Sequence, residues 1–165
     1  MIAVDTDFKP PLLLRHPHLQ TTLQTLLGRG EPDGRLERLS TPDQDFVEVL
    51  WLGQGAGPVV VLLPGLGGSA WSPYATGMAK SLVNAGYRVA ILHARGCGTE
   101  VNRLPKAYHS GQTEDLAHFL ACLKCRLGST PVFAVGFSLG GNVLLKYLAE
   151  TRSDALVERA VAVSP

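Results

Sequence analysis

Hydrophobic and polar residues form two different patterns along the chain. Two short runs that mix apolar and polar residues, 36–40 and 46–52, flank the turn-forming sequence Thr41-Pro42-Asp43. This arrangement predicts an antiparallel hairpin at the edge of a sheet. From residue 59 onward the apolar runs become continuous, which is typical of strands buried on both faces.

Beyond residue 59, expected strands and helices alternate. The apolar runs predict strands at 59–63, 87–92, 131–135 and 158–163, and the intervening segments predict helices at about 72–84, 113–127 and 142–152. Thr113 is the expected N-cap of the second helix, and glycines are expected to end the first two. Alternation after an antiparallel start predicts an α/β fold with a mainly parallel sheet.

The 165 residues suffice for one compact domain and not for two ordinary ones. Residues 1–34 contain scattered Pro and Gly and are expected to be irregular apart from a short helix at 18–27, which leaves 35–165 as the folded domain. A content of 45% hydrophobic and 18% charged residues indicates a globular protein. The net charge of +1 gives no electrostatic reason to expect binding to nucleic acid or to an acidic membrane.

The sequence also suggests a cellular setting. No apolar run approaches the ~20 residues that a transmembrane helix needs, and the N-terminus does not have the pattern of a signal peptide. Three cysteines cannot all pair with one another. A reduced, cytoplasmic environment is therefore the expectation.

The segment Gly136-Phe137-Ser138-Leu139-Gly140 has the pattern G-x-S-x-G and lies between an expected strand and an expected helix. This context is typical of a nucleophile elbow, in which the serine sits on a strained turn and glycines allow close backbone contacts. Ser138 is accordingly predicted to be a catalytic nucleophile. The alternative is a strand-turn-helix unit whose small residues serve packing alone.

A nucleophilic serine needs hydrogen-bond donors for the oxyanion that forms during acyl transfer. The loop 64–69, Pro-Gly-Leu-Gly-Gly-Ser, directly follows the strand at 59–63, and a Gly-rich loop at the carboxyl end of a strand can point a backbone N–H into an active site. The backbone N–H groups of Leu66 and Leu139 are the predicted pair. A phosphate-binding loop is the alternative, but the lysine of a Walker A motif and the G-x-G-x-x-G spacing are both missing.

Three stretches of the chain, Phe8–Thr21, Arg95–Asp115 and Gly136–Asn142, resemble the YheT-like branch of the α/β-hydrolases. The resemblance implies an α/β-hydrolase fold that is truncated here after about the sixth strand. It also implies a serine hydrolase of carboxylic esters, with short acyl esters or lipid esters as small-molecule substrates and with no cofactor and no metal. Two departures from the family pattern, Pro64 and Gly98-Thr99, affect loops near the site.

The partners of a catalytic serine follow it in this fold, first Asp or Glu and then His. After Ser138 the chain has no histidine, and its acids are Glu150, Asp154 and Glu158. The triad acid and histidine are therefore expected to be absent, and the fragment is expected to be nearly inactive. The upstream histidines at positions 93, 109 and 118 are expected to serve packing or loop structure.

The cysteines and the reaction type allow other interpretations. Cys97 is a rival nucleophile without an evident base. Cys122 and Cys125 form a C-x-x-C inside an expected helix, which favours buried helix-face cysteines over a redox pair. The competing function is that of a non-catalytic, degenerate hydrolase fold used for binding. A third reading keeps the fold but changes the reaction to thioester or amide hydrolysis.

Overall fold

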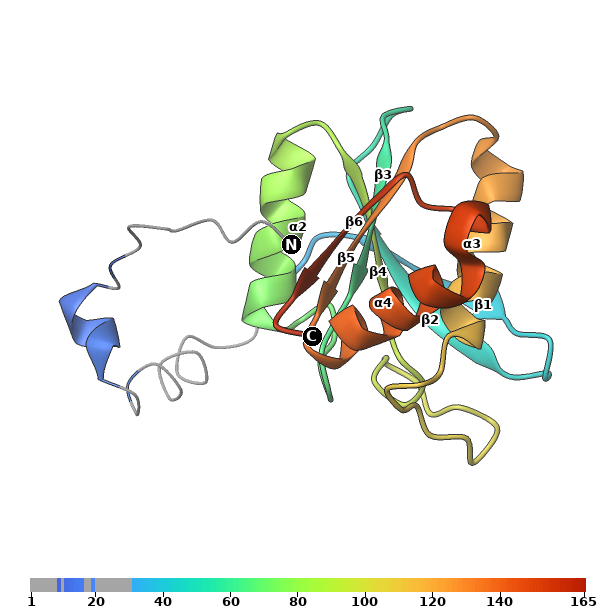
Figure 1. Ribbon diagram of the computed structural model, residues 1–165, viewed down its shortest axis with the longest axis horizontal. Helices are drawn as coiled ribbons and strands as arrows, with labels where there is room; N and C mark the ends of the chain where they lie inside the picture. The colour runs from blue at the N-terminus through green and yellow to red at the C-terminus, as the bar shows by residue number, and fades with distance from the viewer. Residues whose placement is uncertain (1–8, 10, 17–18, 20–30) are drawn as a thin grey trace.

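The computed structural model describes residues 9, 11–16, 19 and 31–165, and residues 35–163 form a sheet with helices on both faces (Figure 1). Part of the stretch Phe8–Thr21, and all but residue 19 of the helix expected at 18–27, lies outside the described residues. The elements are a 3-10 helix η1 (Leu12–Arg15), strands β1 (Arg35–Ser40), β2 (Phe46–Leu52) and β3 (Val59–Leu63), helix α2 (Pro73–Asn84), β4 (Arg88–Leu92), α3 (Glu114–Leu127), β5 (Val132–Phe137), α4 (Leu139–Thr151), a 3-10 turn η2 (Arg152–Asp154) and β6 (Arg159–Val163). Within the described part of the chain, no helix combines the length and apolar content that crossing a bilayer requires.

The six strands form one mixed sheet in the order β1-β2-β4-β3-β5-β6. β1 and β2 pair antiparallel at one edge, which confirms the predicted hairpin, and β2 pairs antiparallel with β4. From β4 through β6 all pairs are parallel. The carboxyl ends of the four parallel strands therefore lie at one edge, where α/β proteins place their sites.

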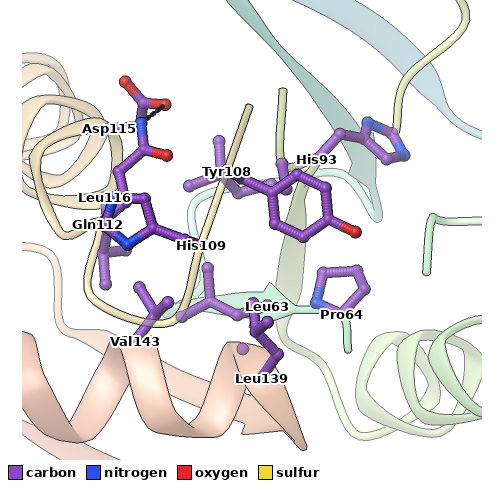
Figure 2. Close-up of a pocket in the computed structure, with 13 residues that line it drawn as sticks. Leu63, Pro64, His93, Tyr108, His109, Gln112, Asp115, Leu116, Leu139 and Val143 are labelled. Carbon is purple, nitrogen blue, oxygen red and sulfur yellow. Dashed lines mark hydrogen bonds between the residues drawn. The ribbon is translucent and has the colours of Figure 1, made fainter. Parts of the chain in front are cut away.

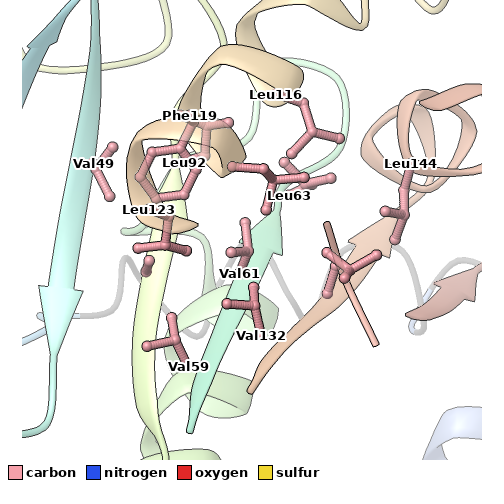
Figure 3. Close-up of a cluster of buried hydrophobic side chains, with 14 of the residues drawn as sticks. Val49, Val59, Val61, Leu63, Leu92, Leu116, Phe119, Leu123, Val132 and Leu144 are labelled. Atoms are coloured by element: carbon pink, nitrogen blue, oxygen red, sulfur yellow. The ribbon is translucent and has the colours of Figure 1, made fainter. Parts of the chain in front are cut away.

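Alternate residues of β3 point into two separate cores. Val59, Val61 and Leu63 pack on one face against α3 and α4, together with Phe119 and Leu144 (Figure 3). Val60 and Leu62 belong to the cluster on the opposite face, which α2 covers. All five residues of β3 are buried, because the strand lies in the middle of the sheet between two helical layers.

Helix α4 begins earlier than predicted, and the N-cap of α3 lacks the expected side-chain hydrogen bond. α4 begins at Leu139, three residues before the predicted start, because the chain turns directly from strand to helix at Ser138. The Gly140-Gly141 pair, which disfavours a helix by propensity, is buried inside its first turn. Thr113 is the N-cap of α3 as predicted, but its hydroxyl donates to Glu150 at 2.6 Å instead of capping the helix.

β6 is the far edge of the sheet, and its outer side is exposed. It pairs with β5 only, and the burial pattern along Arg159–Val163 is exposed at four of five positions. Val161 and Val163 expose 55% and 38% of their surface. An apolar strand edge without a cover is a template for association with another chain.

We predict that the polypeptide of these 165 residues associates through β6. Replacing Val161 by Lys puts a charge on the edge strand and is expected to raise the soluble monomeric fraction in size-exclusion chromatography. Val101→Lys is the matched control, because Val101 is 91% exposed but lies outside any strand. A wild-type chain that is monodisperse and melts cooperatively would contradict the prediction.

Candidate active site

Ser138 stands alone between the end of β5 and the start of α4, in a backbone conformation that is unusual for a residue with a side chain. Its φ is 49° and its ψ is −121°. Its N–H donates to the carbonyl of Val163 at 2.9 Å, and its carbonyl accepts from the N–H of Asn142 at 3.0 Å. Both the N–H and the carbonyl of Ser138 are thus hydrogen-bonded, and its side chain is exposed at the surface.

Two glycines allow this sharp turn. A Cβ at Gly136 would lie 2.5 Å from the carbonyl oxygen of Gly140, and a Cβ at Gly140 would lie 2.4 Å from the carbonyl oxygens of both Leu63 and Pro64. The first turn of α4 therefore rests directly on the backbone at the ends of β3 and β5. No larger residue fits at either position without moving that backbone.

The loop 64–69 runs beside Ser138, since a Cβ at Gly65 would lie 3.2 Å from the Ser138 Cβ. The N–H of Gly65 donates to the hydroxyl of Tyr74 at 2.9 Å, and the N–H of Gly67 donates to the hydroxyl of Tyr108 at 2.6 Å. Within the described part of the chain, the N–H of Leu66 between them has no acceptor. Leu139 is the first residue of α4, so its N–H has no carbonyl partner inside the helix.

An open pocket of about 360 Å³ contains Ser138 together with Gly65, Leu66, Tyr74, Phe137, Val163 and Ser164. None of these side chains is a base that could accept the Ser138 proton. Among the later acids, Glu150 binds Thr113 and Lys146, while Asp154 and Glu158 are exposed outside this pocket. The predicted nucleophile and the Leu66 donor thus share one pocket, without a general base from the residues that the structure describes.

His93 is a buried structural residue rather than a base for Ser138. Its Nε2 accepts a hydrogen bond from the N–H of Ala70 at 3.0 Å, so the proton lies on Nδ1, which donates to the carbonyl of Glu48 at 3.1 Å. Its ring stacks on Trp71 at 5.5 Å, and burial lowers its pKa below the usual value. His93 directly follows β4, which is separated from β5 by β3, as expected.

His109, His118, Cys122 and Cys125 also lie outside the pocket that contains Ser138. His109 accepts from the N–H of Gly111 through Nδ1, and His118 contacts the carbonyl of Ser40 through Nε2 at 2.9 Å. Cys125 is exposed on α3, so the prediction of buried helix-face cysteines is wrong for Cys125, while Cys122 is partly buried and packs against the core. α3 is amphipathic and its core face is filled by Leu116, Phe119, Leu120 and Leu123, which leaves the cysteines at its margin and its outer surface.

A buried ion cluster holds the segment 93–113, which connects β4 to α3 without a helix or strand of its own. The Arg95 side chain is only 2% exposed and binds carboxylates of Asp43, Asp45 and Asp115 at 2.7–3.2 Å. The bond from Arg95, and then the bond from Thr41, holds the pKa of Asp43 well below its usual range. The sequence could not pair these residues because up to 52 positions separate them.

Two acids of the hairpin fix the rest of this segment through hydrogen bonds. Asp45 is fully buried and accepts from the side chain of Asn102 and the N–H groups of Arg103 and Leu104. Burial raises the pKa of Asp45, but these hydrogen bonds outweigh burial and leave the pKa below its usual value. Glu48 accepts from the N–H and hydroxyl of Thr99.

A second cavity, of about 60 Å³, lies between the 108–116 stretch and the start of α4 (Figure 2). Apolar side chains such as Leu63, Leu139 and Val143 line one side, and Tyr108 with Gln112 lines the other. Gln112 donates to Asp115 at 2.9 Å, while its buried Oε1 has no hydrogen-bond partner in the described chain. Across the described residues, no group of three His, Cys, Asp or Glu side chains could hold a metal ion.

We predict that Gly140→Ala destabilises the protein by about 1–3 kcal/mol, because its Cβ would overlap two carbonyl oxygens. Gly77→Ala is the matched control on α2, where a Cβ would meet nothing within 4 Å. That change is expected to raise stability by up to about 1 kcal/mol through helix propensity. Urea unfolding measures both, and equal effects of the two substitutions would refute the packing argument.

Acid is expected to loosen the ion cluster. Because the folded pKa of Asp43 lies below its unfolded value of about 4, the stability from this carboxylate is complete above that pH and is lost as the pH falls through the folded pKa. Asp43→Asn should lower the urea midpoint at pH 7 and flatten its dependence on pH below 5. Asp154→Asn, at an exposed position without an ion pair in the described chain, should leave the profile unchanged. Parallel profiles for wild type and Asp43→Asn would refute this account.

Comparison with known proteins agrees with the geometry. Residues 58–165 match the family model described as alpha/beta hydrolase fold. The chain is 40% identical over 163 residues to the Escherichia coli (strain K12) protein named "Putative esterase YheT", covering 96% of this chain and 48% of that one. It is 31% identical over 159 residues to monoacylglycerol lipase ABHD2 of Danio rerio, covering 90% and 37% respectively. The chain thus spans about half or less of the length of these relatives.

Solved structures share the fold. An α/β serine hydrolase from Xanthomonas campestris, XC6422, superposes with a TM-score of 0.65 at 19% identity, covering 82% of this chain and 63% of that one. The Pyrococcus furiosus esterase Pf2001 gives a TM-score of 0.61 at 24% identity, with coverage of 73% and 48%. At these identities the likeness concerns the fold, and the family assignment comes from the sequence matches. On those matches, the chain belongs to the α/β-hydrolase family and is YheT-like within it.

Proposed function

We propose that this chain carries the nucleophilic half of a serine esterase, with Ser138 attacking carboxylic ester substrates. The observation that carries the proposal is the left-handed backbone of Ser138 on the turn from β5 to α4, beside a Leu66 N–H that has no acceptor among the described residues. A residue with a side chain adopts such a backbone only where its surroundings enforce it, and such strain clusters at active sites. The esterase and lipase names of the sequence relatives support an ester as the substrate.

The reaction proceeds in two acyl transfers. The Ser138 oxygen attacks the ester carbonyl carbon, the carbonyl oxygen becomes an oxyanion, and the bond to the alcohol oxygen then breaks. The N–H groups of Leu66 and Leu139 stabilise the oxyanion, and one such donor is typically worth about 3–4 kcal/mol in the transition state. Water attacks the resulting acyl-enzyme, releases the carboxylic acid and restores the Ser138 hydroxyl.

The proton of Ser138 must pass to a base that the described pocket does not contain. In this fold the acid and the histidine follow the serine along the chain, and residues 139–165 contain no histidine. We therefore assign base catalysis to residues beyond these 165, and the non-catalytic binding protein remains the second candidate. The Ser138 hydroxyl has no general base beside it in the described pocket, and this observation favours the second candidate.

A fluorophosphonate probe distinguishes the two functions. We expect it to label the protein expressed from its natural gene, and we expect labelling to disappear in Ser138→Ala. Ser164→Ala is the matched control, because Ser164 lines the same pocket and carries the same kind of hydroxyl as Ser138. Labelling that survives in Ser138→Ala would reject the proposed nucleophile, and an unlabelled wild type would support the binding protein.

The polypeptide limited to these 165 residues is expected to hydrolyse p-nitrophenyl acetate at a negligible rate. Removing the serine or histidine of a triad lowers turnover by roughly 10⁶-fold in a well-studied protease. The measurement compares the wild-type polypeptide with Ser138→Ala at equal concentration. A robust rate that depends on Ser138 would show that a base is present within this chain.

A further inference from the structure

Three consecutive peptide groups of the loop 64–68 have fixed orientations. The outer two are held through the N–H groups of Gly65 and Gly67, which donate to the hydroxyls of Tyr74 and Tyr108. In the middle group, the carbonyl of Gly65 accepts from the N–H of Gly68 at 2.9 Å. Because the C=O and N–H of a trans peptide point in opposite directions, this bond turns the Leu66 N–H away from Gly68 and leaves it available.

Tyr74 and Tyr108, the two tyrosines that accept hydrogen bonds from the loop, come from different parts of the chain. Tyr74 lies in the first turn of α2, nine residues from Gly65, and so belongs to the same local unit as the loop. Tyr108 is 41 residues from Gly67 and comes from the segment 93–113. This segment depends on the carboxylates of the β1–β2 hairpin for its position, through Arg95, Asn102 and Thr99. The Tyr108 bond thus joins the loop beside Ser138 to the opposite half of the sheet.

The hydrogen bond from Gly67 to Tyr108 matters for the loop because Gly67 is otherwise weakly constrained. Its φ is +63° and it has no side chain, so local sterics alone do not fix the peptide between Leu66 and Gly67. A Cβ at Gly67 would meet nothing within 4 Å, so packing does not hold this residue in place either. Among the described residues, the hydroxyl of Tyr108 is the hydrogen-bond acceptor for the N–H of this peptide group.

The Tyr108 phenol stays in its neutral form and can accept the hydrogen bond from Gly67 over a wide pH range. Burial, and then the neighbouring Cys97 thiol, raise the pKa of the Tyr108 phenol above its usual value, while the Gly67 N–H acts in the opposite direction. The phenol therefore stays neutral at physiological pH, and its oxygen accepts the Gly67 bond without carrying a charge. A neutral acceptor leaves the field beside Ser138 free of a negative charge that would oppose an oxyanion.

We propose that Tyr108 is a positioning residue that fixes the Leu66–Gly67 peptide and thereby holds the Gly65–Gly68 turn, whose Gly65–Leu66 peptide directs the Leu66 N–H toward the oxyanion of the Ser138 reaction. The catalytic part of this inference rests on the proposed function. The hydrogen-bond part concerns only the loop 64–68 and is tested separately. Tyr108 acts through the loop and need not touch the substrate.

Amide hydrogen exchange measured by NMR tests the hydrogen-bond part. In Tyr108→Phe the ring remains and only the acceptor is lost, so exchange at Gly67 should accelerate about 3- to 10-fold, as expected for one net hydrogen bond. Exchange at Gly65, which Tyr74 holds, should change less than twofold. Tyr87→Phe is the matched control, because the Tyr87 ring packs on Phe133 and its hydroxyl has no hydrogen-bond partner in the described chain. A folded Tyr108→Phe with unchanged Gly67 exchange would overturn the proposal.

A second test uses the wild-type protein and therefore does not depend on whether a variant folds. Relative to intrinsic rates, Gly67 should exchange about 3- to 10-fold more slowly than Leu66, because the Gly67 N–H donates to Tyr108 and the Leu66 N–H has no acceptor in the part of the chain that the structure describes. Equal protection of the two amides would overturn the proposed geometry even if Tyr108→Phe does not fold.

Kinetics on the protein expressed from its natural gene test the catalytic part. Tyr108→Phe should lower kcat for a p-nitrophenyl ester about 3- to 10-fold and leave KM nearly unchanged, because an oxyanion donor acts mainly in the transition state. A change in KM alone, or no change, would reject the positioning role. A wild type without Ser138-dependent turnover would instead reject the proposed function, and the exchange results would still decide the loop geometry.

Discussion

The reversal of the chain at Ser138 is the constraint on which the rest of the site depends. The first turn of α4 can approach the ends of β3 and β5 only because Gly136 and Gly140 have no side chains to separate the backbones. The same approach forces Ser138 into a left-handed conformation and raises its side chain above the edge of the sheet. A residue in that conformation stores strain, which the two-sided packing of the sheet must offset.

The conformation of the loop beside Ser138 has a different cause, because side chains from outside the loop fix it. The parallel strands and their helices fix where the loop begins and ends, but hydroxyl acceptors from α2 and from the segment 93–113 set its peptide orientations. That segment is in turn bound by acids of the hairpin. The antiparallel edge of the sheet therefore contributes to the site at the parallel centre although it supplies no residue to the Ser138 pocket.

The sequence predicted those features that depend on neighbouring residues. The continuous run 59–63 predicted a central strand, and G-x-S-x-G between a strand and a helix placed Ser138 on its turn. The start of α4 was misplaced because Gly140-Gly141 disfavours a helix locally while tertiary packing requires one there. The ion cluster of Arg95 and the tyrosine anchor of Gly67 could not be predicted, since nothing local indicates which partners meet across 41 to 52 residues.

Arg95 has one further consequence, which concerns how the fold is crosslinked. Its guanidinium joins Asp115, Asp45 and Asp43 across separations of 20, 50 and 52 residues, and it closes loops of chain as a covalent bridge would. The three cysteines of the chain are all free thiols, so no disulfide performs this task. A disulfide is opened by a reductant, whereas this bridge responds to protons and is indifferent to the redox state of its surroundings. Lysine could not replace it, because a single ammonium lacks the planar fork that reaches several carboxylates at once.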